Sequence, residues 1–139
     1  MAYDSNNIFA KILRGEAPCI KVFEDEQTLA FMDLMPQADG HVLIVPKEPA
    51  VTLLELSEEG AMAAIRTTRR IAIAVKQALG TEGLHVAQLN GAAAGQTVPH
   101  VHFHVIPHAT GTVLRMHAMQ AASQESLQAM AERIKACLA

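Results

Sequence analysis

The chain has 139 residues, half of them hydrophobic, and a formal charge of −3, which is typical of a single folded domain with a substantial core, here expected over residues 1–139. The acidic balance, without a basic cluster, argues against a nucleic-acid polymer as partner, because such binding depends on many neutralised phosphates. The apolar residues form no membrane-spanning run and the first seven residues lack the order of a secretory signal, so the sequence predicts a cytoplasmic protein with no membrane partner.

The first half of the chain predicts one short helix and three strands. Residues 8–14 follow capping-type residues and stop at Gly15, which indicates a helix. Residues 20–24 and 28–32 are apolar runs joined by a three-residue turn, which predicts a hairpin. Residues 41–45 form a third strand that ends at Pro46.

The second half predicts two helices and two further strands. Ser57 can cap a long helix that runs to about residue 79, where Gly80 stops it. Residues 84–89 and the histidine-rich segment that begins at residue 100 are the fourth and fifth strands, and a last amphipathic helix begins at about Ser123. Hairpins with one long helical crossover predict an α+β fold: a five-stranded antiparallel sheet with a long crossover helix and short flanking helices.

Three alternating histidines, His100, His102 and His104, are the most informative feature of the sequence. In an extended strand they lie on one face, with Val101 and Phe103 on the other face toward the core. Alternating imidazoles suit two chemistries: a ring nitrogen attacking phosphorus, with its tautomer fixed by the other nitrogen, or zinc ligation. The residues by themselves leave both open.

A loop of small residues, 90–97, directly precedes these histidines. Its glycines and alanines let a ligand approach the backbone, and Gln96 and Thr97 add side-chain donors suited to a phosphate. The loop lacks the Gly-Lys-Ser/Thr of a Walker loop. Joined to the histidines, it predicts a phosphate-binding segment.

Residues 100–106 read His-φ-His-φ-His-φ-φ, where φ is hydrophobic, and follow Gly-Gln-Thr-Val at residues 95–98. With the segment 39–47, Asp-Gly-His-Val-Leu-Ile-Val-Pro-Lys, this pattern resembles the histidine triad superfamily of nucleotide hydrolases and transferases. The resemblance extends from about residue 7 to residue 107. It implies the fold of the histidine triad (HIT) superfamily and a small nucleotide substrate, with purine favoured over pyrimidine.

The resemblance also implies roles for individual residues. His102 is the expected nucleophile, its tautomer fixed by the backbone carbonyl of His100, with His104 and Gln96 near the phosphate or the leaving group. His41 is an expected partner behind the triad. The expected substrate contacts are the base pocket Ile8, Phe9, Phe31 and Leu34, Asp33 for the ribose hydroxyls, and Asn90, Gly95, Thr97 and Val98 around the phosphate.

Two departures from the family pattern carry expectations. Many bacterial relatives begin Cys-Ile-Phe-Cys-Lys-Ile and use these cysteines for a structural zinc, whereas this chain has Asn7 and Ala10 at those positions, so we expect no metal and no cofactor. After the triad many relatives read Ile-Pro-Arg, whereas this chain has His108 in place of the arginine, which weakens the expectation for dinucleoside polyphosphates. His85 and His117 have no role implied by the resemblance.

The predicted function is a hydrolase that releases a nucleoside monophosphate from a phosphoramidate or a dinucleoside polyphosphate through a nucleotidyl-histidine intermediate. Its rivals are a zinc-binding protein or metallohydrolase that uses the same histidines, and a non-catalytic nucleotide-binding protein. A homodimer is also expected, by resemblance and because the long helix, the fourth strand and the last helix carry more apolar surface than one sheet covers. The apolar helix positions in this argument are Met62, Ile65, Ile71 and Val75, with Leu127, Met130, Ile134 and Cys137 on the last helix.

Overall fold

The computed structural model describes residues 2–115 and 121–138, so His117 lies outside the described residues. The elements follow the predicted order. The helices are α1 (Ile8–Leu13), α2 (Glu58–Leu79) and α3 (Gln124–Lys135), with a short 3-10 turn η1 (Ala92–Ala94). The strands are β1 (Lys21–Glu24), β2 (Thr28–Met32), β3 (Val42–Pro46), β4 (Gly83–Gln88) and β5 (Phe103–His108).

All strand pairs are antiparallel, in the order β1-β2-β3-β5-β4. The pairs β1–β2 and β2–β3 are neighbours in sequence, while α2 carries the chain from β3 to the far edge strand β4. The predicted α+β fold with an antiparallel five-stranded sheet is therefore confirmed. Strand β5 then returns between β3 and β4, so it is an interior strand of the sheet.

Capping residues explain where the helices begin and end. The Ser57 side chain accepts a hydrogen bond from the Gly60 amide at the start of α2, and Gly80 ends the helix with φ of 62°. Glycine is favoured at a position with this left-handed backbone conformation, because glycine lacks a Cβ atom. Asn7 and Ser123 cap α1 and α3 in the same way as Ser57 caps α2.

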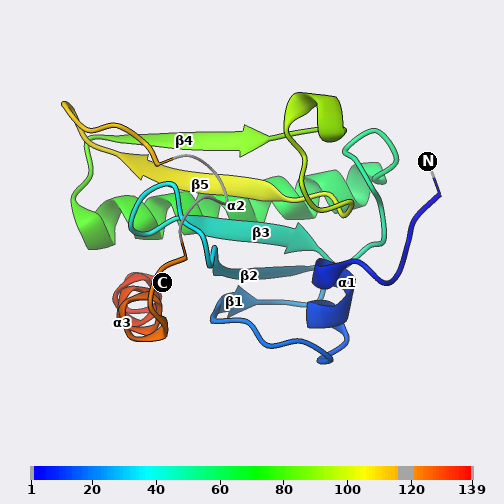
Figure 1. Cartoon of the computed structure of the whole chain (residues 1–139), viewed down its shortest axis with the longest axis horizontal. Coiled ribbons are helices and arrows are strands. Elements are labelled where there is room, and N and C mark those ends of the chain that lie inside the picture. Colours follow the sequence, from blue (N-terminus) through cyan, green and yellow to red (C-terminus); the bar gives the residue numbers. More distant parts are fainter. Residues whose placement is uncertain (1, 116–120, 139) are drawn as a thin grey trace.

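The two faces of the sheet have different coverings (Figure 1). One face packs against α2 and α3, where Ile44, Ile71, Val75, Val105 and Ile134 form part of the main core. The opposite face carries α1 and a smaller apolar cluster of Phe9, Leu29, Phe31, Leu43 and Val45. This second face is only partly covered by α1, and the histidines lie beside it.

The structure corrects the predicted histidine strand. Strand β5 begins only at Phe103, so His100 and His102 precede it and only His104 lies within it. Val101 does not join Phe103 in the main core but packs in a separate cluster with Ala50 and Leu56. The reason is that both neighbours of β5 stop pairing with it at Phe103, β3 at Ile44 and β4 at Gln88.

The structure also corrects the surface attributed to the last helix. Leu127 and Ile134 are buried against the main core, so the apolar side of α3 is covered within the chain. Ile71 and Val75 of α2 are fully buried as well, whereas Met62 and Ile65 are 55% and 51% exposed.

Among the described residues, no helix combines the length and apolar character that crossing a membrane requires.

Candidate functional site

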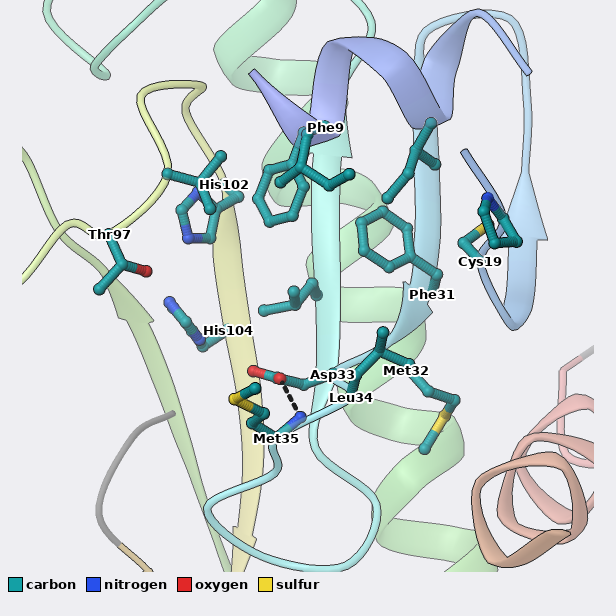
Figure 2. Close-up of a pocket in the computed structure, with 15 residues that line it drawn as sticks. Phe9, Cys19, Phe31, Met32, Asp33, Leu34, Met35, Thr97, His102 and His104 are labelled. Carbon is teal, nitrogen blue, oxygen red and sulfur yellow. Dashed lines mark hydrogen bonds between the residues drawn. The ribbon is translucent and has the colours of Figure 1, made fainter. Parts of the chain in front are cut away.

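A pocket of about 280 Å³ opens on the face of the sheet that carries α1, near the lower end of the range for small-molecule sites. Figure 2 shows His102, His104 and Thr97 on one side of it and Phe9 and Phe31 on the other. Its walls come from α1, β2, β3, β5 and the loop before β5. The lining residues are Ile8, Phe9, Ile12, Pro18, Cys19, Phe31, Met32, Asp33, Leu34, Met35, Leu43, Thr97, Val98, His102 and His104.

Sheet register brings the apolar wall and the histidines together. Phe31 of β2 is paired with Leu43 of β3, and Leu43 is paired with His104 of β5. Directly paired residues point to the same face, so these three form a row across the sheet. Phe9 of α1 packs over the row, edge-on to Phe31 at 5.4 Å and to His102 at 4.9 Å between ring centroids.

The geometry of His102 defines its tautomer. Its Nδ1 lies 2.7 Å from the backbone oxygen of His100. A carbonyl oxygen can only accept, so Nδ1 carries the proton, and in the neutral ring the lone pair is on Nε2. The ring lines the pocket, which makes Nε2 a candidate nucleophile.

His100 stands behind the pocket and is fully buried. Its Nε2 donates to the backbone oxygen of Pro46 at 2.7 Å, and its Nδ1 lies 2.6 Å from the Tyr3 hydroxyl. Burial lowers the pKa of His100 below the ordinary 6.5, opposed by the hydrogen bond to Pro46. The ring is therefore neutral near pH 7, and it supports His102 from behind the pocket.

His41 and His104 form a buried pair with a defined direction. The Gln37 amide donates to His41 Nδ1 at 3.1 Å, so the proton of the neutral His41 ring is on Nε2. That Nε2 donates to His104 Nδ1 at 2.9 Å. The neutral His104 ring consequently carries its proton on Nε2, where it can donate to a bound anion.

Asp33 follows β2 and is 7% exposed. Its Oδ1 accepts from the Met35 amide at 2.8 Å, the dashed line in Figure 2. Its Oδ2 is buried and has no hydrogen-bond partner among the described residues, although it lies 3.4 Å from His41 Nε2. A buried carboxylate oxygen without a partner is costly, and a hydroxyl-bearing ligand in the pocket would remove that cost.

The loop before β5 divides the predicted phosphate contacts into two groups. Thr97 and Val98 line the pocket, and Gly95 turns the chain toward them with φ of 102°. Gln96 instead holds the loop together: its amide nitrogen donates to the Val51 and Val98 carbonyls, and its amide oxygen accepts from the Gly91 amide. Asn90 likewise accepts from the Leu53 amide and does not line the pocket.

Metal chemistry has one candidate site among the described residues. Ligand atoms of Asp33, His41 and His104 lie within 4.8 Å of one another, but both His41 nitrogens already take part in directed hydrogen bonds. The structural zinc of bacterial relatives does not fit. Asn7 caps α1 and Ala10 is a buried apolar residue at the positions where those relatives have cysteines.

Several pocket residues lie outside the sequence prediction. They are Ile12, Pro18, Cys19, Met32, Met35 and Leu43, together with Tyr3 behind the pocket. Helical spacing from Ile8 and Phe9 could have indicated Ile12, and the strand pattern could have indicated Leu43. No sequence signal pairs Tyr3 with His100, which is 97 residues away.

Fold and pocket together define a small α+β protein with a histidine-lined ligand pocket on one face of an antiparallel sheet. The model of the HIT domain family matches residues 14–111. The chain belongs to this family.

Known relatives agree with this assignment. The chain is 43% identical over 100 residues to an adenosine 5'-monophosphoramidase of Schizosaccharomyces pombe, covering 72% of each protein. It is 40% identical over 100 residues to an adenylylsulfatase of Arabidopsis thaliana, covering 72% of this chain and 51% of that longer protein. A Hit-like protein of Bartonella henselae, described as involved in cell-cycle regulation and crystallised with an unknown ligand, superimposes with a TM-score of 0.93 at 44% identity, over 99% of this chain and 100% of that one.

Proposed function

We propose that the protein is a nucleotide hydrolase that releases a nucleoside monophosphate through a covalent nucleotidyl-histidine intermediate on His102. The observation that carries the proposal is the His102 ring, whose Nδ1 proton is held by the His100 carbonyl while the ring lines the pocket. The relatives named adenosine 5'-monophosphoramidase and adenylylsulfatase support a nucleoside phosphoryl group as the substrate. We favour a phosphoramidate over a dinucleoside polyphosphate, because this chain has His108 at the position where many relatives have the arginine that follows Ile-Pro.

Three groups of pocket residues suit three parts of the substrate: the base, the ribose and the phosphate. The apolar wall of Ile8, Phe9, Phe31 and Leu34 suits a planar base, with purine favoured through the family resemblance. The buried Asp33 Oδ2, which has no hydrogen-bond partner among the described residues, is suited to a ribose hydroxyl. The phosphate would then lie between the histidines and the loop carrying Gly95, Thr97 and Val98.

The reaction proceeds in two displacements at phosphorus. His102 Nε2 forms a bond to phosphorus while the bond from phosphorus to the leaving nitrogen or oxygen breaks. Water then attacks phosphorus, and the bond to His102 breaks. For a phosphoramidate, one water is consumed overall: its OH goes to phosphorus and its remaining hydrogen to the leaving amine. The His104 Nε2–H is placed to stabilise the phosphoryl oxygens.

The catalytic test compares His102→Ala with His85→Ala. His85 is an exposed histidine hydrogen-bonded to His108 outside the pocket, so it controls for loss of an imidazole. Each protein is incubated with an adenosine phosphoramidate and with a diadenosine polyphosphate, and AMP is measured by mass spectrometry. His102→Ala should lose about 10⁴-fold or more in turnover while still binding AMP, and His85→Ala should match the wild type.

The same assay separates the rivals. Near wild-type turnover by His102→Ala would refute the histidine nucleophile. Turnover that disappears with a chelator and returns with zinc would favour a metallohydrolase. AMP binding by a wild-type protein that hydrolyses neither substrate would favour a non-catalytic nucleotide-binding protein.

We also propose that two copies of this chain associate through α2 and the edge strand β4. Strand β4 pairs only with β5 among the described strands, so one of its edges is unpaired. Met62 and Ile65 on α2 and Val86 on β4 are each about half exposed, and α2 packs against β4. Pairing two β4 edges would cover apolar surface and remove a free sheet edge.

A further inference from the structure

We propose that Tyr3 is a positioning residue for the nucleophilic histidine: its hydroxyl holds His100 in the ring orientation and tautomer that aim the His100 carbonyl at His102 Nδ1. The inference rests on the proposed function for the role of His102. Tyr3 itself does not line the pocket. Its effect on the reaction therefore passes through His100.

The hydrogen bonds around His100 allow only one arrangement of protons. The Pro46 oxygen can only accept, so His100 Nε2 carries a proton. A second proton on Nδ1 would make the ring a cation, which burial disfavours, as the lowered pKa of His100 also indicates. Nδ1 is therefore an acceptor, and the Tyr3 hydroxyl is the donor in the 2.6 Å contact.

Side-chain hydrogen bonds add to two backbone hydrogen bonds at His100. His100 precedes β5, which begins at Phe103, so it lies outside the strand pairing. Its amide donates to the Val98 carbonyl, and the Val101 amide, in the peptide group that carries the His100 carbonyl, donates to the Ala50 carbonyl. The ring is clamped between Pro46 at the end of β3 and Tyr3 in the N-terminal segment. Fixing the ring on both sides fixes the residue whose carbonyl orients His102.

The N-terminal segment is itself held in place, so Tyr3 provides a firm anchor. The Asn7 amide and side chain both donate to the Asp4 carbonyl, and Asn7 then caps α1. Figure 1 shows this segment and α1 at the end of the sheet where β3 finishes. Because α1 also carries Phe9, a purely structural role for Tyr3 would alter the base pocket and raise KM. The proposed role affects the nucleophile and lowers kcat.

The test uses Tyr3→Phe, which removes the hydroxyl and keeps the ring, with Ser5→Ala in the same segment as control. We expect Tyr3→Phe to lower kcat about tenfold, the value of one buried hydrogen bond, with KM and AMP affinity within about twofold. Nitrogen-15 NMR of the histidine rings should show His102 protonated on Nδ1 in the wild type and a smaller fraction of that tautomer in Tyr3→Phe. Ser5→Ala should change neither.

A second background tests whether Tyr3 acts through His100. In His100→Phe, adding Tyr3→Phe should cost less than about twofold in kcat, because the partner nitrogen is already gone. An equal loss in both backgrounds, a change in KM alone, or wild-type kcat with an unchanged His102 tautomer would each overturn the inference. If the wild type hydrolyses neither substrate, the proposed function fails, and the NMR comparison, which needs no substrate, decides the role of Tyr3.

Discussion

Replacing Asp33 by asparagine tests whether the pocket recognises a ribose. The Oδ1 of Asp33 is used by the Met35 amide, whereas Oδ2 is buried, negatively charged and without a hydrogen-bond partner among the described residues. Asparagine has nearly the same shape and retains an oxygen for Met35, but it removes the charge and one acceptor. A hydrogen bond from a hydroxyl to a charged acceptor contributes about 1.5–3 kcal/mol. Asp33→Asn should therefore lower kcat/KM about 10- to 150-fold.

The assay measures kcat/KM for a ribonucleoside phosphoramidate and for its 2'-deoxy and 3'-deoxy analogues. In the wild type, an analogue that lacks the recognised hydroxyl should have a lower kcat/KM than the ribose substrate. In Asp33→Asn this difference in kcat/KM should largely disappear for at least one analogue, because the acceptor for the missing hydroxyl is gone. Asp39→Asn is the matched control, since Asp39 is exposed and paired with Arg115 away from the pocket. An equal loss for all three substrates would refute ribose recognition and would point to an effect on His41, 3.4 Å away.

Three further predictions concern stability, metal content and assembly. Because the pKa of His100 is lowered on folding, the unfolded chain binds more protons just below pH 6.5, so stability should fall as the pH decreases through that value, by up to about 1.4 kcal/mol per pH unit. Urea unfolding at pH 7.5 and pH 5 should show a smaller decrease for His100→Phe, and equal decreases would contradict the assignment. With Asn7 and Ala10 in place of two cysteines, elemental analysis should find no bound zinc, and about one zinc per chain would show the prediction to be wrong. Light scattering should give a dimer mass for the wild type and a monomer for a Met62→Lys, Val86→Lys variant, whereas a wild-type mass near 14.9 kDa would exclude the dimer.

Local signals were sufficient for most of the elements. Ser57 and Gly80 define the ends of α2 in both sequence and structure, because capping depends on residues within one turn. Runs of apolar residues identified β2 and β3, and all five residues of each strand are buried. The start of the histidine strand was the main error. It depends on where both neighbouring strands cease to pair with β5, and the β3 residues 42–44 lie some 60 positions earlier in the chain.

The sequence by itself determined the types of residue available for chemistry: three alternating histidines, a loop of small residues before them and an acidic residue after β2. Only the tertiary structure decided which of them meet. It placed His102, His104, Asp33 and Thr97 in one pocket, whereas the Gln96 side chain bonds to the distant Val51 carbonyl and so ties its loop to another segment. Periodicity reports which face of an element a side chain occupies, but contacts between distant segments depend on how the faces are packed. For that reason the hydrogen bond from Tyr3 to His100, 97 residues apart, is visible only in the folded chain.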